Sequence, residues 1–304
     1  MKILVCDAIH KDGVSMLQDA GFQVDLDTSI TPEALIEKIP SYDAIVIRSR
    51  TKVRKDVLEA ATNLKAVARA GVGLDNVDLV TAKERGIEVI NSPEAPSNAV
   101  AELIIGLMFS LARNIAEADS TMKQGKWEKK RLSGFEIHGK TMGIIGLGRI
   151  GYLVAEKAKA LGMKLLIYNR SKDRVKDLVA TLGTELVDLE KVYSESDIVS
   201  IHLPATPETR HMVGADQFKI MKPTAYIINV SRGGIVDEEA LKKALDAGSI
   251  AGAALDVYEE EPTKDMDLVG RPNVVCTPHI GAGSVEASTG NSTIVAEKLI
   301  KLLG

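Results

Sequence analysis

A glycine-rich turn between two apolar segments restricts the possible folds of this chain more than any other feature. Residues 142–145 form an apolar run typical of a buried strand, Gly146, Gly148 and Gly151 follow, and residues 152–161 have a helical pattern. In such a unit the first glycine permits a tight turn, the second lets a pyrophosphate approach the backbone, and the third lets the helix pack closely on the strand. The N–H groups and the dipole at the helix start favour phosphate charge. The segment therefore predicts a dinucleotide-binding strand–turn–helix unit.

Length and charge limit the classes of protein to which the chain can belong. Its 304 residues suffice for two domains of the usual ~100–200 residues. The net charge of −4 argues against a general basic surface for nucleic acid or anionic membranes. The longest apolar stretch, residues 99–112, is shorter than the ~20 residues of a membrane span. Cys6 and Cys276 lack the spacing of a metal motif. We therefore expect a cytoplasmic protein with no metal site.

Strand-like and helix-like segments alternate along both halves of the chain, which predicts parallel sheets with helices on both faces. In the first half the expected strands are residues 2–7, 22–26, 44–48, 65–70 and 87–91, and the expected helices are 14–20, 32–39, 55–61 and 77–84. In the second half the expected strands are 142–145, 164–168, 197–202, 225–230, 252–257 and 273–277, and the expected helices are 152–161, 174–182, 189–194, 215–220 and 238–247.

The middle of the chain breaks this alternation. Residues 91–97 contain two prolines among small polar residues and predict a crossover between domains. A single long helix is expected from Asn98 to Met122, followed by a polar connection over residues 123–140. Because this helix is apolar on most sides, we expect it to lie at an interface, which suggests a homodimer.

The predicted fold class is α/β, with two doubly wound parallel-sheet domains. A Rossmann-type dinucleotide-binding domain of residues 98–284 is inserted in a flavodoxin-like substrate domain of residues 1–97 plus 285–304. The last helix, residues 285–303, is long enough to return to the first domain.

Three charged or titratable residues follow predicted strands of the second half: Arg232, Glu261 and His279. Ligands bind at the carboxyl ends of strands in such sheets. A hydride transfer at a hydroxyl carbon needs a proton partner, and histidine suits that role near neutral pH. A neighbouring carboxylate stabilises the imidazolium, and an arginine can bind a substrate carboxylate through two parallel bonds. Taken singly, a loop histidine is most often merely exposed, an arginine before two glycines is often structural, and acidic runs are usually solvated.

Four sequence motifs, which follow one another along the chain, are more informative about function than the positions of these three residues. They are GLGRIG at 146–151, NVSRGGIVDE at 229–238, ALDVYEEEP at 254–262 and TPHIGA at 277–282. Together they resemble the D-isomer-specific 2-hydroxyacid dehydrogenase family, and within it the short phosphoglycerate dehydrogenases. The resemblance covers essentially the whole chain and includes VIRSRT at 46–51, ARAGVGLDNVD at 68–78 and GKW at 125–127.

The resemblance implies a catalytic site of Arg232, Glu261 and His279, with His279 as the acid and base. Glu261 is favoured over its two glutamate neighbours because the acid of the family directly precedes the proline. For the substrate it implies backbone N–H groups of Val72 and Gly73 at the carboxylate, with the following arginines at a phosphate: Arg48 and Arg69, with Arg50 as a further cation nearby.

The resemblance also implies a set of nicotinamide-dinucleotide contacts. Asp256 is the expected partner of the nicotinamide carboxamide, and Pro204 and Thr206 line the adenine side. The other implied cofactor-binding residues are Gly146, Gly148, Arg149, Ile150, Gly151, Asn169, Arg170, Ser171, His202, Thr209, Val230 and Gly281.

One position departs from the pattern of the family. The strand after the glycine turn should end in an acid that holds the ribose 2′-hydroxyl of NAD, but Asn169 stands there. An asparagine does not repel a 2′-phosphate, and Arg170, Ser171 and Lys172 can bind one. The sequence therefore predicts NAD(H) or NADP(H) as cofactor, with a lean to NADP(H).

The resemblance favours oxidation of 3-phosphoglycerate to 3-phosphohydroxypyruvate, the first step of serine synthesis. An NADPH-dependent glyoxylate or hydroxypyruvate reductase is the alternative that Asn169 and Arg170 support. A non-enzymatic dinucleotide sensor that binds partners, like the co-repressors of the family, is a third. Since the chain ends at Gly304, we expect no feedback inhibition through a C-terminal regulatory domain.

Overall fold

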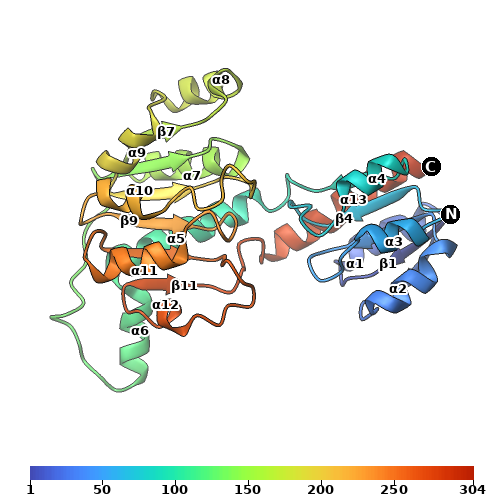
Figure 1. The fold of residues 1–304 in the computed structure, drawn as a ribbon, viewed down its shortest axis with the longest axis horizontal. Helices are drawn as coiled ribbons and strands as arrows, with labels where there is room; N and C mark the ends of the chain where they lie inside the picture. Colours follow the sequence, from blue (N-terminus) through green and yellow to red (C-terminus); the bar gives the residue numbers. More distant parts are fainter. The chain divides into compact units, whose positions relative to one another are not determined.

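The computed structural model describes all of residues 1–304 and divides them into two compact units. The first unit contains Met1–Ala99 and Ala282–Gly304, and the second contains Val100–Gly281 (Figure 1). These boundaries lie two and three residues from those expected from the sequence.

The first unit is built on a parallel five-stranded sheet in the order β2-β1-β3-β4-β5. This is the flavodoxin-like order, in which the strand order reverses at a switch point between β1 and β3. Its strands are β1 (Lys2–Val5), β2 (Gln23–Leu26), β3 (Ala44–Ile47), β4 (Ala66–Arg69) and β5 (Glu88–Asn91).

Both faces of this sheet are covered, so its middle strand β3 is apolar and buried at every position rather than alternating with polar residues. In β1, Ile3 and Val5 contact the helices of one face, while Leu4 contacts those of the other. The first face carries α1 (Lys11–Asp19) and α13 (Val285–Leu303), and the second carries α2 (Pro32–Lys38), the 3₁₀ helix η1 (Ile39–Ser41), α3 (Lys55–Ala60) and α4 (Leu79–Glu84). The last helix of the chain thus completes the first unit, as the sequence indicates.

The second unit contains a parallel six-stranded sheet in the order β11-β10-β9-β8-β6-β7. Its strands are β6 (Thr141–Ile145), β7 (Lys164–Tyr168), β8 (Ile198–Ile201), β9 (Tyr226–Asn229), β10 (Gly252–Leu255) and β11 (Val274–Cys276). Beyond β7, Leu186 forms a single parallel bridge with Ile167. If Leu186 is counted as a reduced third strand, the order is that of a Rossmann fold, and the switch point lies between β6 and β8.

Two helical layers cover this second sheet. One face packs on α5 (Ser97–Arg113), α7 (Arg149–Ala160) and α8 (Lys172–Leu182). The other packs on α9 (Leu189–Glu195), α10 (Ala215–Ile220), α11 (Glu238–Asp246) and the short α12 (Met266–Val269), which the sequence did not predict. The switch point therefore opens at the carboxyl ends of β6 and β8, where the glycine turn lies.

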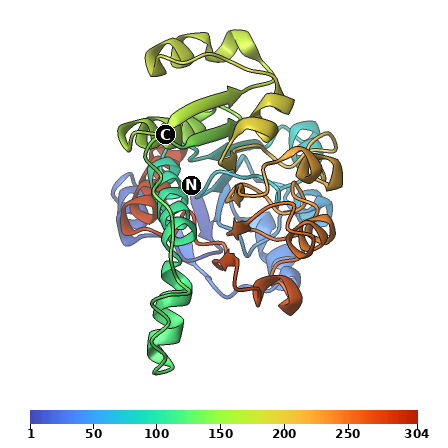
Figure 2. The ribbon, with the colours of Figure 1, turned by 90° about the vertical axis from the view of Figure 1, so that its left-hand side faces the viewer.

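The single long helix expected from Asn98 to Met122 is wrong. The structure has α5 and α6 (Ile115–Lys123), bent by 67° at Asn114, whose φ of 52° is left-handed. Asparagine tolerates that conformation better than most residues because its short side chain bonds locally, and here Asn114 Nδ2 donates to Ser133 O. Beyond the bend, α6 extends away from the sheet (Figure 2). No single helix is long and apolar enough to cross a membrane, and the bent pair meets that test only by length and composition.

Candidate active site

The glycine turn after β6 has the shape that a dinucleotide requires. Gly146 has a φ of 97°, and a Cβ there would lie 2.5 Å from His202 O in the loop after β8. A Cβ at Gly151 would overlap Gly146 O, whereas a Cβ at Gly148 would meet nothing within 4 Å. No side chain caps the start of α7. The open space at Gly148 beside an uncapped helix N-terminus fits a pyrophosphate group.

Asn169 at the end of β7 is bonded to this turn. Its Oδ1 accepts from Leu147 N–H at 3.0 Å, and its Nδ2 donates to Ser171 O at 3.0 Å. The side chain therefore holds the glycine turn and the loop of Arg170 together. The Thr206 hydroxyl and, more weakly, the charge of the exposed Arg170 lower the pKa of Glu208. The loops after β7 and β8 thus lie close to each other on the expected adenosine side.

The loop after β8 carries the expected residues His202, Pro204, Thr206 and Thr209. Thr209 Oγ1 donates to Pro204 O at 2.7 Å and accepts from Thr206 N–H at 2.8 Å, so this side chain sets the shape of the loop. Burial lowers the pKa of His202 to about 3, which keeps its ring neutral. Its Nε2 is buried without a hydrogen-bond partner in the protein, and its ring lies beside the position of Gly151.

His279 and Glu261 are in direct contact. His279 Nδ1 lies 2.6 Å from Glu261 Oε2, and the other carboxylate oxygen accepts from Tyr258 N–H at 3.2 Å. The His279 side chain is 52% exposed, so its ring remains accessible to a ligand. Its backbone has a φ of 53°, and its N–H donates to Asp256 O at 2.9 Å. Since Nδ1 faces Glu261, Nε2 is the nitrogen left for chemistry.

Asp256 is fully buried and holds the segment that carries His279. One carboxylate oxygen accepts from Thr277 Oγ1 at 2.6 Å and from Ile280 N–H at 2.8 Å, and the other accepts from Gly281 N–H at 2.8 Å. A Cβ at Gly281 would lie 3.1 Å from Val230 Cγ1 and 3.2 Å from Asp256 Oδ2. The structure therefore gathers the expected nicotinamide-side residues, and it shows Asp256 already engaged with donors of the protein.

Arg232 is placed by Asn229, a buried residue that is not among the site residues predicted from the sequence. Asn229 Oδ1 accepts from Ser231 N–H at 3.1 Å, and its Nδ2 donates to Arg232 O at 2.9 Å. A Cβ at Gly233 would overlap Tyr258 O, so the loop of Arg232 contacts the loop that carries Glu261. The signal that could have identified Asn229 is a polar residue at the end of an otherwise apolar strand.

In the first unit, Asp7 organises the loop after β3. Its buried carboxylate accepts from Arg48 N–H at 2.5 Å, from Thr51 Oγ1 at 2.8 Å and from Arg50 Nε at 3.0 Å. Arg50 also donates to Ile30 O at 2.9 Å and to Cys6 O at 2.5 Å. Arg50, expected as a further cation near the phosphate, therefore has three of its guanidinium nitrogens bonded within the protein, although its side chain is 50% exposed. The side chain of Arg48 donates to Ala8 O at 3.3 Å.

The remaining expected substrate residues also lie at the carboxyl edge of this sheet. Arg69 ends β4, and a Cβ at Gly71 would lie 2.7 Å from Arg69 Nη1. Asn91 Nδ2 donates to Val72 O at 2.6 Å, which fixes the peptide between Val72 and Gly73. Sequence and structure thus bring Arg48, Arg69, Val72 and Gly73 to neighbouring loops of one unit.

Comparison with known proteins agrees with this geometry. Residues 105–281 match the model of the NAD-binding domain of D-isomer specific 2-hydroxyacid dehydrogenases. The chain is 47% identical over its full length to D-3-phosphoglycerate dehydrogenase of Methanocaldococcus jannaschii, and it spans 57% of the length of that relative. It is 43% identical to hydroxypyruvate reductase of Thermotoga maritima, covering 100% of this chain and 98% of the relative.

Among solved structures, the TT0316 protein of Thermus thermophilus superposes with a TM-score of 0.91 at 32% identity, covering 100% of this chain and 97% of that protein. The family model matches more than half of the chain, and the Thermotoga relative is covered almost completely. The chain therefore belongs to the D-isomer specific 2-hydroxyacid dehydrogenase family.

Proposed function

We propose that the chain is a dehydrogenase that moves a hydride between a nicotinamide cofactor and C2 of a small D-2-hydroxy acid. The observation that carries this proposal is the 2.6 Å contact between His279 Nδ1 and Glu261 Oε2, at the sheet edge that also carries the glycine turn. A histidine held through one nitrogen presents the other in a fixed direction.

When bound, the nicotinamide supplies the hydride chemistry. His279 Nε2 takes the proton of the substrate hydroxyl during oxidation and returns it during reduction. Glu261 orients the ring through Nδ1 and stabilises the imidazolium that forms. Arg232 binds the substrate carboxylate and polarises the adjacent carbonyl.

We further propose 3-phosphoglycerate as the substrate, in the first step of serine synthesis. The arginines Arg48 and Arg69, at the carboxyl edge of one sheet, support a phosphate site on a chain whose net charge is −4. The name of the Methanocaldococcus relative agrees with this substrate. A hydroxypyruvate or glyoxylate reductase is the second candidate. It is favoured by the engagement of Arg50 with Asp7, which removes one cation, and by the name of the Thermotoga relative.

For the cofactor we propose NAD(H) or NADP(H), with a preference for NADP(H). Asn169 brings no negative charge to the ribose, and Arg170 beside it is exposed. A 2′-phosphate at this loop would gain charge-assisted bonds from Arg170 and Ser171.

We also propose that the chain forms a homodimer. Large apolar side chains are exposed on α6 and the connection after it, with Ile115 at 51%, Met122 at 55% and Trp127 at 79%. Such a patch commonly marks an interface. Light scattering of the purified protein at micromolar concentration tests this, and a monomer mass would contradict it.

Reductive turnover of 3-phosphohydroxypyruvate and of hydroxypyruvate, each with NADH and NADPH, tests the function. We expect the highest kcat/KM for the phosphorylated acid with NADPH, and a kcat lowered by about 10²-fold or more in His279→Ala. A preference for hydroxypyruvate would favour the second candidate. Full turnover by His279→Ala would refute the proposed mechanism, and no turnover of any 2-oxo acid by the intact chain would favour the dinucleotide-sensor alternative.

A further inference from the structure

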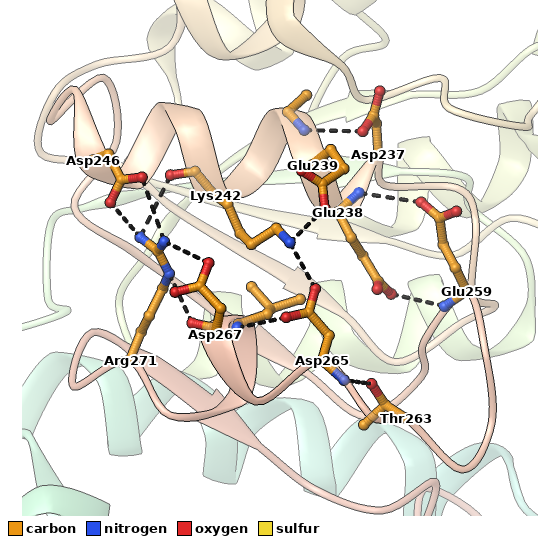
Figure 3. A network of polar contacts seen from close by, with 12 residues as sticks. Asp237, Glu238, Glu239, Lys242, Asp246, Glu259, Thr263, Asp265, Asp267 and Arg271 are labelled. Atoms are coloured by element: carbon orange, nitrogen blue, oxygen red, sulfur yellow. Dashed lines mark hydrogen bonds and ion pairs between the residues drawn. The ribbon is translucent and has the colours of Figure 1, made fainter.

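Three consecutive glutamates after β10 have three different partners. Glu261 contacts His279, and the exposed Glu260 pairs with Lys264 at 3.3 Å. Glu259 turns instead toward the start of α11, where its Oε1 accepts from Glu238 N–H at 3.2 Å. Glu238 returns the contact, because its Oε1 accepts from Glu259 N–H at 2.7 Å (Figure 3). We name these two residues the reciprocal pair.

Capping of α11 accounts for only half of the reciprocal pair, because Glu259 Oε1 accepts the N–H of the first helical residue whereas Glu238 Oε1 binds outside the helix. Asp237 is the N-cap of that helix, and its Oδ1 accepts from Ala240 N–H at 2.9 Å. Glu238 lies in the first turn, where a carboxylate is favoured by the helix dipole without any further partner. Its side chain reaches the loop after β10 instead, and burial, followed by the charge of Glu259, raises its pKa. The hydrogen bond from Glu259 N–H acts against that rise, and it ties the backbone of Glu259 to the start of α11.

The contact joins three segments around the candidate active site. His211, in the loop after β8, lies with Nε2 3.1 Å from Glu259 Oε1 and donates its backbone N–H to Gly234 O at 2.7 Å. Gly234 follows the Arg232 loop, and Glu261 lies two residues beyond Glu259. The loops of the adenosine side, of Arg232 and of Glu261 therefore meet at the reciprocal pair.

The other anchors of this segment lie before and after Glu261. Before it, Tyr258 Oη donates to Leu255 O at 3.2 Å and to Thr277 O at 3.0 Å. After it, Asp265 accepts from Lys242 Nζ at 2.8 Å, and Arg271 binds Asp246 and Asp267 in the same network (Figure 3). Between Tyr258 and Asp265, Glu259 is the residue whose backbone is bonded to another element.

We infer that Glu238 and Glu259 are positioning residues that set the place of Glu261 against His279. They do not touch the reacting atoms, since both carboxylates are bonded to backbone groups of the opposite partner. This inference rests on the proposed role of His279. A displacement of a catalytic group by about 1 Å costs up to roughly 100-fold in rate, so loss of the pair lowers kcat more than the affinity for either ligand.

Steady-state kinetics of Glu238→Ala and Glu238→Gln test this inference. Glu238→Ala removes the acceptor of Glu259 N–H, and we expect kcat to fall by roughly 10-fold or more, with KM for both substrates within about 3-fold of the native values. Glu238→Gln keeps a carbonyl oxygen in that place and restores most of kcat. Glu260→Ala, which removes only the exposed pair with Lys264, is the matched control and keeps native kinetics.

A double-mutant cycle separates positioning from general destabilisation. In a Glu261→Gln background, whose kcat is already low, Glu238→Ala should have little further effect, because the group that it positions is gone. An equal fall in both backgrounds, or native kcat for Glu238→Ala, would overturn the inference. If Glu261→Gln and His279→Ala both kept native turnover, the proposed function itself would fail, which is a separate outcome.

Discussion

The two sheets are alike at their amino ends and different at their carboxyl ends. Before β3, Asp43 accepts from Lys2 N–H at 2.8 Å and pairs with Lys65 at 3.2 Å. Before β8, Asp197 accepts from Thr141 N–H at 2.8 Å and pairs with Lys222 at 2.9 Å. The same aspartate device therefore ties neighbouring strands in both units.

At the carboxyl ends of the strands, the buried aspartates Asp256 and Asp7 bind different kinds of groups. In the second unit Asp256 binds neutral donors and leaves His279 and Glu261 to each other. In the first unit Asp7 binds a loop and also takes the guanidinium of Arg50. The number of charged residues in a motif is therefore larger than the number available to a ligand, because some of these residues pair with one another inside the fold.

The largest expected effect is on the catalytic rate and concerns the accessible pair of His279 and Glu261 in the second unit. His279→Gln removes the proton acceptor and should lower kcat by about 10²–10⁴-fold. Because the side chain is 52% exposed, the thermal midpoint should stay near the native value. Stopped-flow and steady-state assays with either cofactor measure the rate. A large fall in thermal midpoint with unchanged kcat would show that His279 is structural rather than catalytic.

The next effect concerns the acid that the first unit buries. Asp7→Ala leaves Arg48 N–H and Thr51 N–H without their acceptor and breaks the pair with Arg50. We expect the free energy of unfolding to fall by about 3 kcal/mol, measured by urea denaturation followed by circular dichroism. Glu59→Ala, which removes an exposed pair with Lys55, is the control and should leave the midpoint unchanged. Equal midpoints for the two variants would contradict the role of Asp7.

The sequence was sufficient to predict most elements of the fold, but not the partners of particular side chains such as Arg50. Strands and covering helices followed from apolar periodicity, and α13 begins and ends at the predicted residues. The glycine turn followed from steric needs that only glycine meets. The bend at Asn114 and the engagement of Arg50 depend on tertiary contacts with Ser133 and Asp7, which are distant in sequence. Propensity and spacing carry no information about such partners.

Arg48 and Arg50 provide a direct test of available charge. Arg48→Ala should raise KM for 3-phosphohydroxypyruvate by roughly 10- to 100-fold relative to hydroxypyruvate, because a charge-assisted bond is lost. Arg50→Ala should change that ratio little and lower the thermal midpoint instead, since its partners are Asp7, Ile30 and Cys6. If Arg50→Ala shifted the ratio as strongly as Arg48→Ala, the guanidinium would be available to the substrate after all.

Asn169 tests the cofactor side of the second unit with a smaller change. Asn169→Asp keeps an oxygen for Leu147 N–H but places a negative charge at the ribose and loses the donation to Ser171 O. The ratio of kcat/KM for NADPH over NADH should fall by roughly 10-fold. Asn169→Ala, which adds no charge, separates repulsion from loss of the two bonds. An unchanged ratio for Asn169→Asp would place the 2′ position away from this loop.

The smallest expected effect is on stability, and it tests whether Asp43 and Asp197 play the same role at the amino ends of the two sheets. The N–H of Lys2 and the ammonium of Lys65 hold the pKa of Asp43 below its ordinary value. For Asp197, burial acts in the opposite direction, but the Thr141 N–H and Lys222 outweigh it and also lower the pKa. A lowered pKa stabilises the fold above the unfolded value near 4, and this stability is lost as the pH falls through the folded value.

Asp43→Asn and Asp197→Asn should therefore each lower the free energy of unfolding by about 1 kcal/mol at pH 7. The deficit relative to the native chain should shrink as the pH falls from about 5 toward 3, which urea denaturation across that range measures. If the free energy of unfolding depended on pH in the same way in both variants, Asp43 and Asp197 would stabilise their sheets by the same interaction. A deficit that persisted at low pH in only one variant would mean that hydrogen-bond geometry, rather than charge, holds the strands of that unit, and the two sheets would then differ at both ends.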